Sequence, residues 1–184
     1  MQADELRAIQ APLKDRYRED PSEAAVTLHA EATLGEGVTC NVQTGRSLAR
    51  AGLHPASGGD GTALCSGDML LEALAACAGV TMRAVATALA IPVEGQVTAA
   101  GDLDFRGTLG VDRDAPVGFR EIRLNFELAT DVEDARVAKL VELTERYCVV
   151  LQTLTGSPQL SLDWARADRS GSLAGPARTS PLIR

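Results

Sequence analysis

The 184-residue chain has little of what marks several common classes of protein. Aromatic residues make up only 3% of it, so its hydrophobic core has to be built mainly from Ala, Val and Leu. Basic residues are in the minority, with 18 Lys and Arg against 25 Asp and Glu, and the formal net charge is -7. Because an acidic surface repels phosphate backbones, nucleic acid is not expected as a partner.

Export and membrane signals are missing from the sequence as well. Residues 1–20 are charged and contain no apolar h-region, so no signal peptide is expected. The longest apolar stretch, residues 69–90, is interrupted by Glu72, Arg83 and two threonines, which favours a buried helix over a membrane span. We therefore expect a cytoplasmic protein with no membrane partner.

Patterns typical of metal and cofactor sites are absent too. The chain has two isolated histidines and no Cys-x-x-Cys pair, so neither a zinc site nor another cofactor is expected. In a reducing compartment, the four cysteines point to catalytic or inert thiols and not to structural disulfides.

The first part of the chain changes from helical to strand periodicity. Apolar residues at helical spacing predict a short helix over 4–17. Alternation over 26–34 and again over 38–42, with Gly35 and Gly37 between, predicts a hairpin, and a third short strand is expected over 46–51. Residues 1–22 are therefore assigned to an N-terminal helical extension.

The rest of the pattern alternates helices with strands. The Gly-rich residues 52–66 predict a loop with Ser66 as the N-cap of a long helix over 67–90. Further elements are expected as strands over 93–105 and 122–128, a helix with Asp131 at its N-cap, and a strand over 160–164. The class is α+β with largely antiparallel sheet, in one domain over 23–166. Residues 167–184 lack periodicity and are expected to form a flexible tail.

Two cysteines stand in contrasting contexts, and their pairing is where chemistry is expected. Cys77 lies about three turns inside the long apolar helix, too far from its N-terminus for the helix dipole to lower the thiol pKa. Apolar surroundings would raise that pKa, so a reactive Cys77 needs a cation from elsewhere, most plausibly an arginine. Cys148 follows the later amphipathic helix. Cys40, on a strand, and Cys65, at the mouth of the loop, are interpreted as unreactive thiols.

The run GGDGTALCSGDMLLEALAACAGVTM, followed later by ERYCVVLQTL, resembles the OsmC/Ohr superfamily. The element order matches that superfamily over residues 24–165. The resemblance implies an intertwined homodimer in which antiparallel sheets wrap around long central helices, with active sites at the subunit interface. It also implies a cysteine-based peroxidase that reduces organic hydroperoxides.

The resemblance also implies roles for individual residues. Cys77 would attack the peroxide and become a sulfenic acid, and Cys148 would condense with it to form a disulfide that a dithiol reductant resets. Related proteins use an arginine to hold the thiolate, for which Arg46 and Arg50 are the candidates here. They also use a glutamate ten residues before the cysteine, where this chain has Gly67; the adjacent Asp68 is the candidate replacement.

Two other hypotheses remain open at this point. One is a non-enzymatic dimer that binds a small hydrophobic ligand at the subunit interface, with the cysteines as bystanders. The other is a purely structural dimer with buried thiols. Loss of peroxide consumption in a Cys77→Ser variant distinguishes the peroxidase from both.

Overall fold

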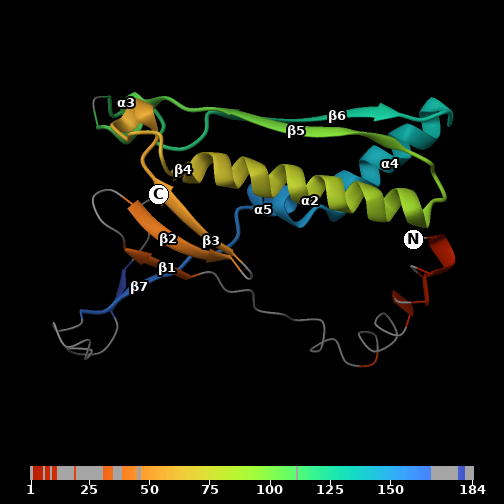
Figure 1. The fold of residues 1–184 in the computed structure, drawn as a ribbon, viewed down its shortest axis with the longest axis horizontal. Coiled ribbons are helices and arrows are strands. Elements are labelled where there is room, and N and C mark those ends of the chain that lie inside the picture. Colours follow the sequence, from red (N-terminus) through yellow and green to blue (C-terminus); the bar gives the residue numbers. More distant parts are fainter. Residues whose placement is uncertain are drawn as a thin grey trace.

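The computed structural model describes residues 2–5, 7–8, 10–11, 19, 31–34, 39–44, 47–110, 112–166 and 178–180. A long central helix lies along a two-stranded hairpin, with two shorter helices on another side and a small sheet beside its N-terminal end (Figure 1). The fold is α+β, as the periodicity predicted.

The small sheet has the strand order β1-β2-β3-β4. β1 (Glu31–Leu34), β2 (Thr39–Thr44) and β3 (Ser47–Gly52) form an antiparallel meander, and the two-residue β4 (Leu64–Cys65) pairs parallel to β3. The predicted hairpin and third strand are thus confirmed within their described residues. Residues 26–30 of the first predicted strand, like most of the predicted helix over 4–17, lie outside the described residues.

The loop before the long helix is shaped by its only histidine. His54 precedes the short 3-10 helix η2 (Pro55–Ser57), and its Nδ1 accepts a hydrogen bond from the Ala56 N–H at 3.0 Å. The imidazole also stacks on the ring of Phe105, with 4.9 Å between the ring centroids. These contacts fix the chain where it turns toward β4 and the long helix.

The long helix α2 (Ser66–Ala88) has one covered face and one uncovered face. Its buried residues recur every four positions and form a single narrow stripe: Leu74, Ala78, Met82 and Ala86. Val80, on another side, is 73% exposed. The sequence predicted a helix buried on most sides, and this is wrong for one chain because the hairpin and the shorter helices cover only one face.

Strands β5 (Glu94–Asp102) and β6 (Glu121–Ala129) form the antiparallel hairpin over α2, in a register that runs from Glu94 opposite Ala129 to Asp102 opposite Glu121. Alternate side chains of this hairpin point toward the helix and are half-buried, including Val97, Ala99, Ile122, Leu124, Phe126 and Leu128. The alternation in the sequence therefore predicted which face of the hairpin packs on α2.

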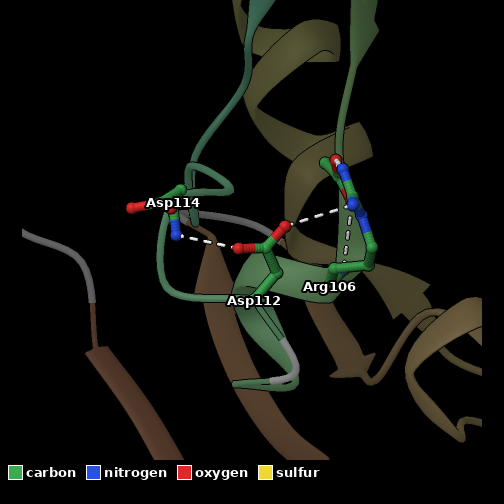
Figure 2. Close-up of polar contacts among 4 residues, drawn as sticks. Arg106, Asp112 and Asp114 are labelled. Atoms are coloured by element: carbon green, nitrogen blue, oxygen red, sulfur yellow. Dashed lines mark hydrogen bonds and ion pairs between the residues drawn. The ribbon is translucent and has the colours of Figure 1, made fainter.

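The connection between the two strands is longer than a turn and is held by charge. It begins with the short helix α3 (Phe105–Thr108), where the sequence predicted the end of a strand. Arg106 lies 3.1 Å from a carboxylate oxygen of Asp112, and the other oxygen of Asp112 accepts the backbone N–H of Asp114 at 3.0 Å (Figure 2). These contacts hold together the segment between the two strands.

Helices α4 (Asp134–Tyr147) and α5 (Val149–Gly156) are separated by a single extended residue, Cys148. Both helices pack against α2. The sequence placed N-caps at Ser66 and Asp131, and both positions are wrong: Cys65 and Glu133 are the N-caps of α2 and α4. Neither actual N-cap side chain makes a capping hydrogen bond, so the usual side-chain signal for a helix start is missing at both.

The last strands lie where the sequence showed only part of the pattern. β7 (Leu162–Trp164) falls within the predicted strand over 160–164 and pairs antiparallel with β8 (Arg178–Ser180). β8 belongs to the segment expected to be a flexible tail. Three residues are too few to produce a recognisable alternation, so no pattern in the sequence indicated this strand.

Two clusters of buried residues make the core. One contains Met82, Ala86, Ile91, Val93 and Leu140 near the C-terminal end of α2. The other contains Leu74, Ala78 and Cys148, with Cys77 packed against it. The second cluster places both cysteines of interest between α2, the hairpin and α5.

Candidate active site

The structure brings Cys77 of α2 and Cys148 of the α4–α5 junction together. Cys148 is completely buried and Cys77 is partly buried beside it. Both are free thiols, and the Cys148 side chain donates a hydrogen bond to the sulfur of Cys77. Residues 71 positions apart in the sequence thus share one small site, as the interpretation of the two motifs predicted.

The surroundings of Cys77 favour its ionised form. Burial opposes ionisation, but hydrogen bonds from the Val150 N–H, the Cys148 thiol and the Val149 N–H outweigh burial, and the pKa of Cys77 is lowered. The hydroxyl of Thr81 contributes a further hydrogen bond to the sulfur. Cys77 is therefore the thiol of the pair that ionises first.

Cys148 behaves in the opposite way. Burial raises the pKa of Cys148, and both its hydrogen bond to Cys77 and the negative charge that Cys77 carries raise it further. Backbone N–H groups of Leu151 and Val150 only partly offset these effects. The pKa values of the two thiols are thus shifted in opposite directions, which suits one cysteine to act as nucleophile and the other to follow it.

The groups that stabilise the Cys77 thiolate were not anticipated from the sequence. An arginine was expected, but the donors in this chain are the free N–H groups in the first turn of α5, a helix other than the one that carries Cys77. The N–H groups at the start of a helix have no intrahelical partner and carry partial positive charge, so they suit an anion. No Gly or Pro separates Tyr147 from Val149, so residue composition alone does not mark the start of α5.

Asp68 lies at the N-terminal end of α2, away from Cys77. It is exposed in the first turn of α2, nine residues before Cys77, which places it roughly 13 Å away along the helix axis. There it lines a cavity of about 160 Å³ together with His54, Cys65 and Phe119. Among the residues that the structure describes, Asp68 has no ion-pair partner.

Of the two candidate arginines the structure describes only Arg50, which is not among the groups that shift the pKa of Cys77. Arg50 is exposed on β3, and its positive charge acts on Asp60 in the loop; hydrogen bonds from Thr62 are the main cause of the lowered pKa of Asp60, and Arg50 adds to them. Arg46 lies outside the described residues. A role for Asp68 or Arg50 at Cys77 therefore requires a second chain.

Arg83, also on α2, makes structural contacts with the start of β5. Its Nη1 donates to the carbonyl oxygen of Val93 at 2.5 Å and lies 3.9 Å from the Glu94 carboxylate.

No cluster of three or more potential metal ligands occurs within the described ranges. By length and composition α2 could cross a membrane, and 28% of its most apolar window is buried in the single chain.

Comparison with known proteins is consistent with the two-cysteine pattern. Residues 59–163, more than half of the chain and including both Cys77 and Cys148, match the family of OsmC-like proteins. The chain belongs to the OsmC-like family. No curated protein matches it.

Solved structures support the fold of this OsmC-like chain. An OsmC-like protein from Mycoplasma pneumoniae aligns with a TM-score of 0.60 at 20% identity, covering 71% of this chain and 89% of that one. A hypothetical protein from Aquifex aeolicus VF5 aligns with a TM-score of 0.56 at 20% identity, covering 74% and 92%. The organic hydroperoxide resistance protein OhrB of Bacillus subtilis aligns with a TM-score of 0.50 at 18% identity, covering 71% and 92%. At these identities the similarity is one of fold.

Proposed function

We propose that this OsmC-like protein is a thiol-dependent peroxidase that reduces organic hydroperoxides. The observation that carries the proposal is the contact between the two thiols, in which Cys148 and the first N–H groups of α5 donate to the sulfur of Cys77. A structural pair of buried thiols has no need of three donors aimed at one sulfur. A nucleophilic thiolate does, because each donor stabilises its charge.

The proposed reaction has two steps on the protein. The Cys77 thiolate attacks one oxygen of the hydroperoxide, the O–O bond breaks, and the second oxygen leaves with a proton as the alcohol; Cys77 is oxidised to a sulfenic acid. The sulfur of Cys148 then attacks the sulfur of Cys77, water leaves, and a disulfide forms. A dithiol supplies two electrons and two protons to restore both thiols.

An organic hydroperoxide fits this site better than hydrogen peroxide. The two residues on either side of Cys148 in the chain carry exposed apolar side chains, with Val149 69% exposed and Tyr147 57% exposed. Both line a groove of about 480 Å³ together with Gln152 and Thr153. An alkyl or aryl group placed against them gains about 0.8 kcal/mol for each CH₂ removed from water.

The proposal includes a homodimer in the cytoplasm. The uncovered face of α2 is apolar, and a second copy of the chain would cover it. A contribution of Arg50 or Asp68 to Cys77 would belong to that dimer, and Arg46 stays a candidate for the same role. The cytoplasm supplies dithiols that can return the disulfide to the reduced state.

The same uncovered face supports a second candidate function. A dimer with an apolar pocket at the subunit interface could bind a small hydrophobic ligand without any chemistry at the cysteines. In that case the ligand would bind equally well to the protein and to a Cys77→Ser variant.

The deciding experiment is a peroxidase assay with cumene hydroperoxide and dithiothreitol. The proposed function predicts consumption by the unaltered protein, loss in Cys77→Ser and retention in Cys65→Ser, and a slower reaction with hydrogen peroxide. Cys65 is a suitable control because it is a free thiol in a different cavity. If the unaltered protein consumes no hydroperoxide, the peroxidase proposal fails and only the ligand-binding and the purely structural dimer remain.

A further inference from the structure

The helical path from α4 to α5 is interrupted at a single residue, and the interruption releases two backbone groups. An unbroken helix would bond the N–H of Val149 to the carbonyl oxygen of Glu145, four residues earlier. Among the described residues this bond does not form. The Cys148 N–H donates to the Thr144 carbonyl at 3.0 Å, and the next backbone bond, from the Gln152 N–H to the Cys148 carbonyl at 2.9 Å, already belongs to α5.

The side chain of Gln152 bonds to the released carbonyl. Its Nε2 donates to the carbonyl oxygen of Glu145 at 2.9 Å, across the junction and seven residues back along the chain. Side chains of a helix lean toward its N-terminus, so a residue near the start of α5 is well placed to reach the end of α4. Thr155, by contrast, bonds within its own helix, to the Leu151 carbonyl at 3.1 Å. Gln152 therefore links the two helices, whereas Thr155 does not.

The bond between Gln152 and Glu145 requires the helix to be broken. In a continuous helix a separation of seven residues spans about 10 Å along the axis, which puts that carbonyl beyond the reach of a glutamine side chain. The bond therefore stabilises the broken arrangement relative to a continuous helix. In the broken arrangement Cys148 lies in the buried cluster against which Cys77 packs, together with Val150 of the first turn of α5.

We propose that Gln152 is a positioning residue that keeps the chain broken at Cys148 and so holds the first turn of α5 against Cys77. The proposal rests on the proposed function for its meaning in catalysis. Its physical content is independent of turnover, because it concerns the conformation of the α4–α5 junction and the reactivity of one thiol. The N–H groups of Val149 and Val150, which lower the pKa of Cys77, belong to the turn that Gln152 holds in place.

The test uses alkylation of Cys77 in the full-length protein. Gln152→Met keeps the length and the helix propensity of the side chain and removes the N–H donor. Iodoacetamide labelling between pH 5 and 10, quantified for each cysteine peptide by mass spectrometry, gives a separate pH profile for every thiol. When the first turn of α5 faces Cys77 less often, the thiolate loses donors. Loss of this hydrogen bond therefore predicts roughly two- to tenfold slower labelling of Cys77 at pH 7, with the profile displaced to higher pH.

The direction of the change and two comparisons make the result specific. A general loosening of the structure would expose the thiol and speed its labelling. Thr155→Val removes a side-chain hydrogen bond made within α5 and should leave the Cys77 profile unchanged, and Cys65, which lines a different cavity, should react alike in all variants.

Three outcomes overturn the proposal: an unaltered Cys77 profile in Gln152→Met, faster labelling in that variant, or an equal displacement in Thr155→Val. Gln152 is exposed, so Gln152→Met is expected to fold. If it does not fold, Gln152→Ala provides the same comparison. A displaced profile in a protein that consumes no hydroperoxide would disprove the peroxidase while leaving the role of Gln152 standing.

Discussion

Cys148 donates a hydrogen bond to Cys77 and, by its place in the chain, immediately precedes the helix whose first N–H groups bind the same sulfur atom. One residue therefore contributes a thiol to the pair and also sets the position of the backbone donors around it. Its own pKa is raised mainly by burial, while that of Cys77 is lowered against the effect of burial by these hydrogen bonds. The two cysteines are thus not interchangeable.

Replacing Cys148 with serine should stop the reaction after one step. The serine hydroxyl still donates to Cys77, so the first attack on the hydroperoxide proceeds, but no disulfide can form with Cys77. We expect one equivalent of hydroperoxide to leave a sulfenic acid at Cys77 that dimedone traps, with turnover with dithiothreitol greatly slowed. Mass spectrometry of the Cys77 peptide checks the adduct. Undiminished turnover in Cys148→Ser would contradict the role of Cys148.

Leu140 should be a main contributor to stability. It is completely buried on α4 and packs in the cluster with Met82 and Ile91. Leu140→Ala removes buried methyl groups and leaves a cavity, so we expect the free energy of unfolding to fall by about 2–5 kcal/mol. Urea denaturation measures it. Leu160→Ala is the matched control, because Leu160 is 74% exposed, and should change the free energy by less than about 0.5 kcal/mol.

Val80 should report on the dimer. It is 73% exposed on the uncovered face of α2, where the proposed partner would bury it. A charge there would be desolvated in the dimer at high cost, so Val80→Glu should yield a monomer with unchanged helix content. Sedimentation velocity and circular dichroism make the two measurements. Val117→Glu, at a similarly exposed valine in the β5–β6 connection, should remain dimeric. A monomeric unaltered protein would disprove the dimer.

Asp104 should make stability sensitive to acid. Hydrogen bonds from the Arg106 side chain and backbone lower the pKa of Asp104 to about 2. Because this pKa is below that of an unfolded aspartate, about 3.9, the stabilisation is present above pH 4 and is lost as the pH falls toward 2. Asp104→Asn should therefore be less stable than the unaltered protein at pH 6 and lose less stability on acidification.

Urea denaturation at several pH values between 6 and 2 tests this prediction. Asp114→Asn is a useful control, because the backbone N–H of Asp114, which donates to the Asp112 carboxylate that Arg106 also contacts, is kept in this variant (Figure 2). That variant should follow the acid dependence of the unaltered protein. If Asp104→Asn follows it as well, the ion pair with Arg106 does not contribute to the acid response.

Regular patterns allowed much of the fold to be predicted from the sequence. The long apolar run became α2, and the alternation over residues 122–128 became β6 with its apolar side toward the helix. The two motifs around Cys77 and Cys148 also predicted that these residues meet. In each case many residues contributed to one signal, so errors at single positions did not change the outcome.

Features that depend on a few residues could not be predicted. The break at Cys148 has no Gly or Pro to mark it, and the starts of α2 and α4 have no capping side chain. The backbone donors at Cys77 carry no side-chain identity at all, since any residue at positions 149 and 150 other than proline supplies an N–H. The sequence pointed to an arginine because a motif identifies side chains and does not identify backbone N–H donors.

Cys148, the single extended residue between α4 and α5, couples the proposed chemistry to the conformation of α5. When Cys77 of the reduced protein is ionised, its negative charge lies against the amide groups that open α5. Once Cys77 is tied to Cys148 that charge is gone, and the opening turn loses an electrostatic anchor. Each catalytic cycle would therefore weaken and then restore the first turn of α5. The amide chemical shifts of Val149 and Val150 would differ between the oxidised and the reduced protein.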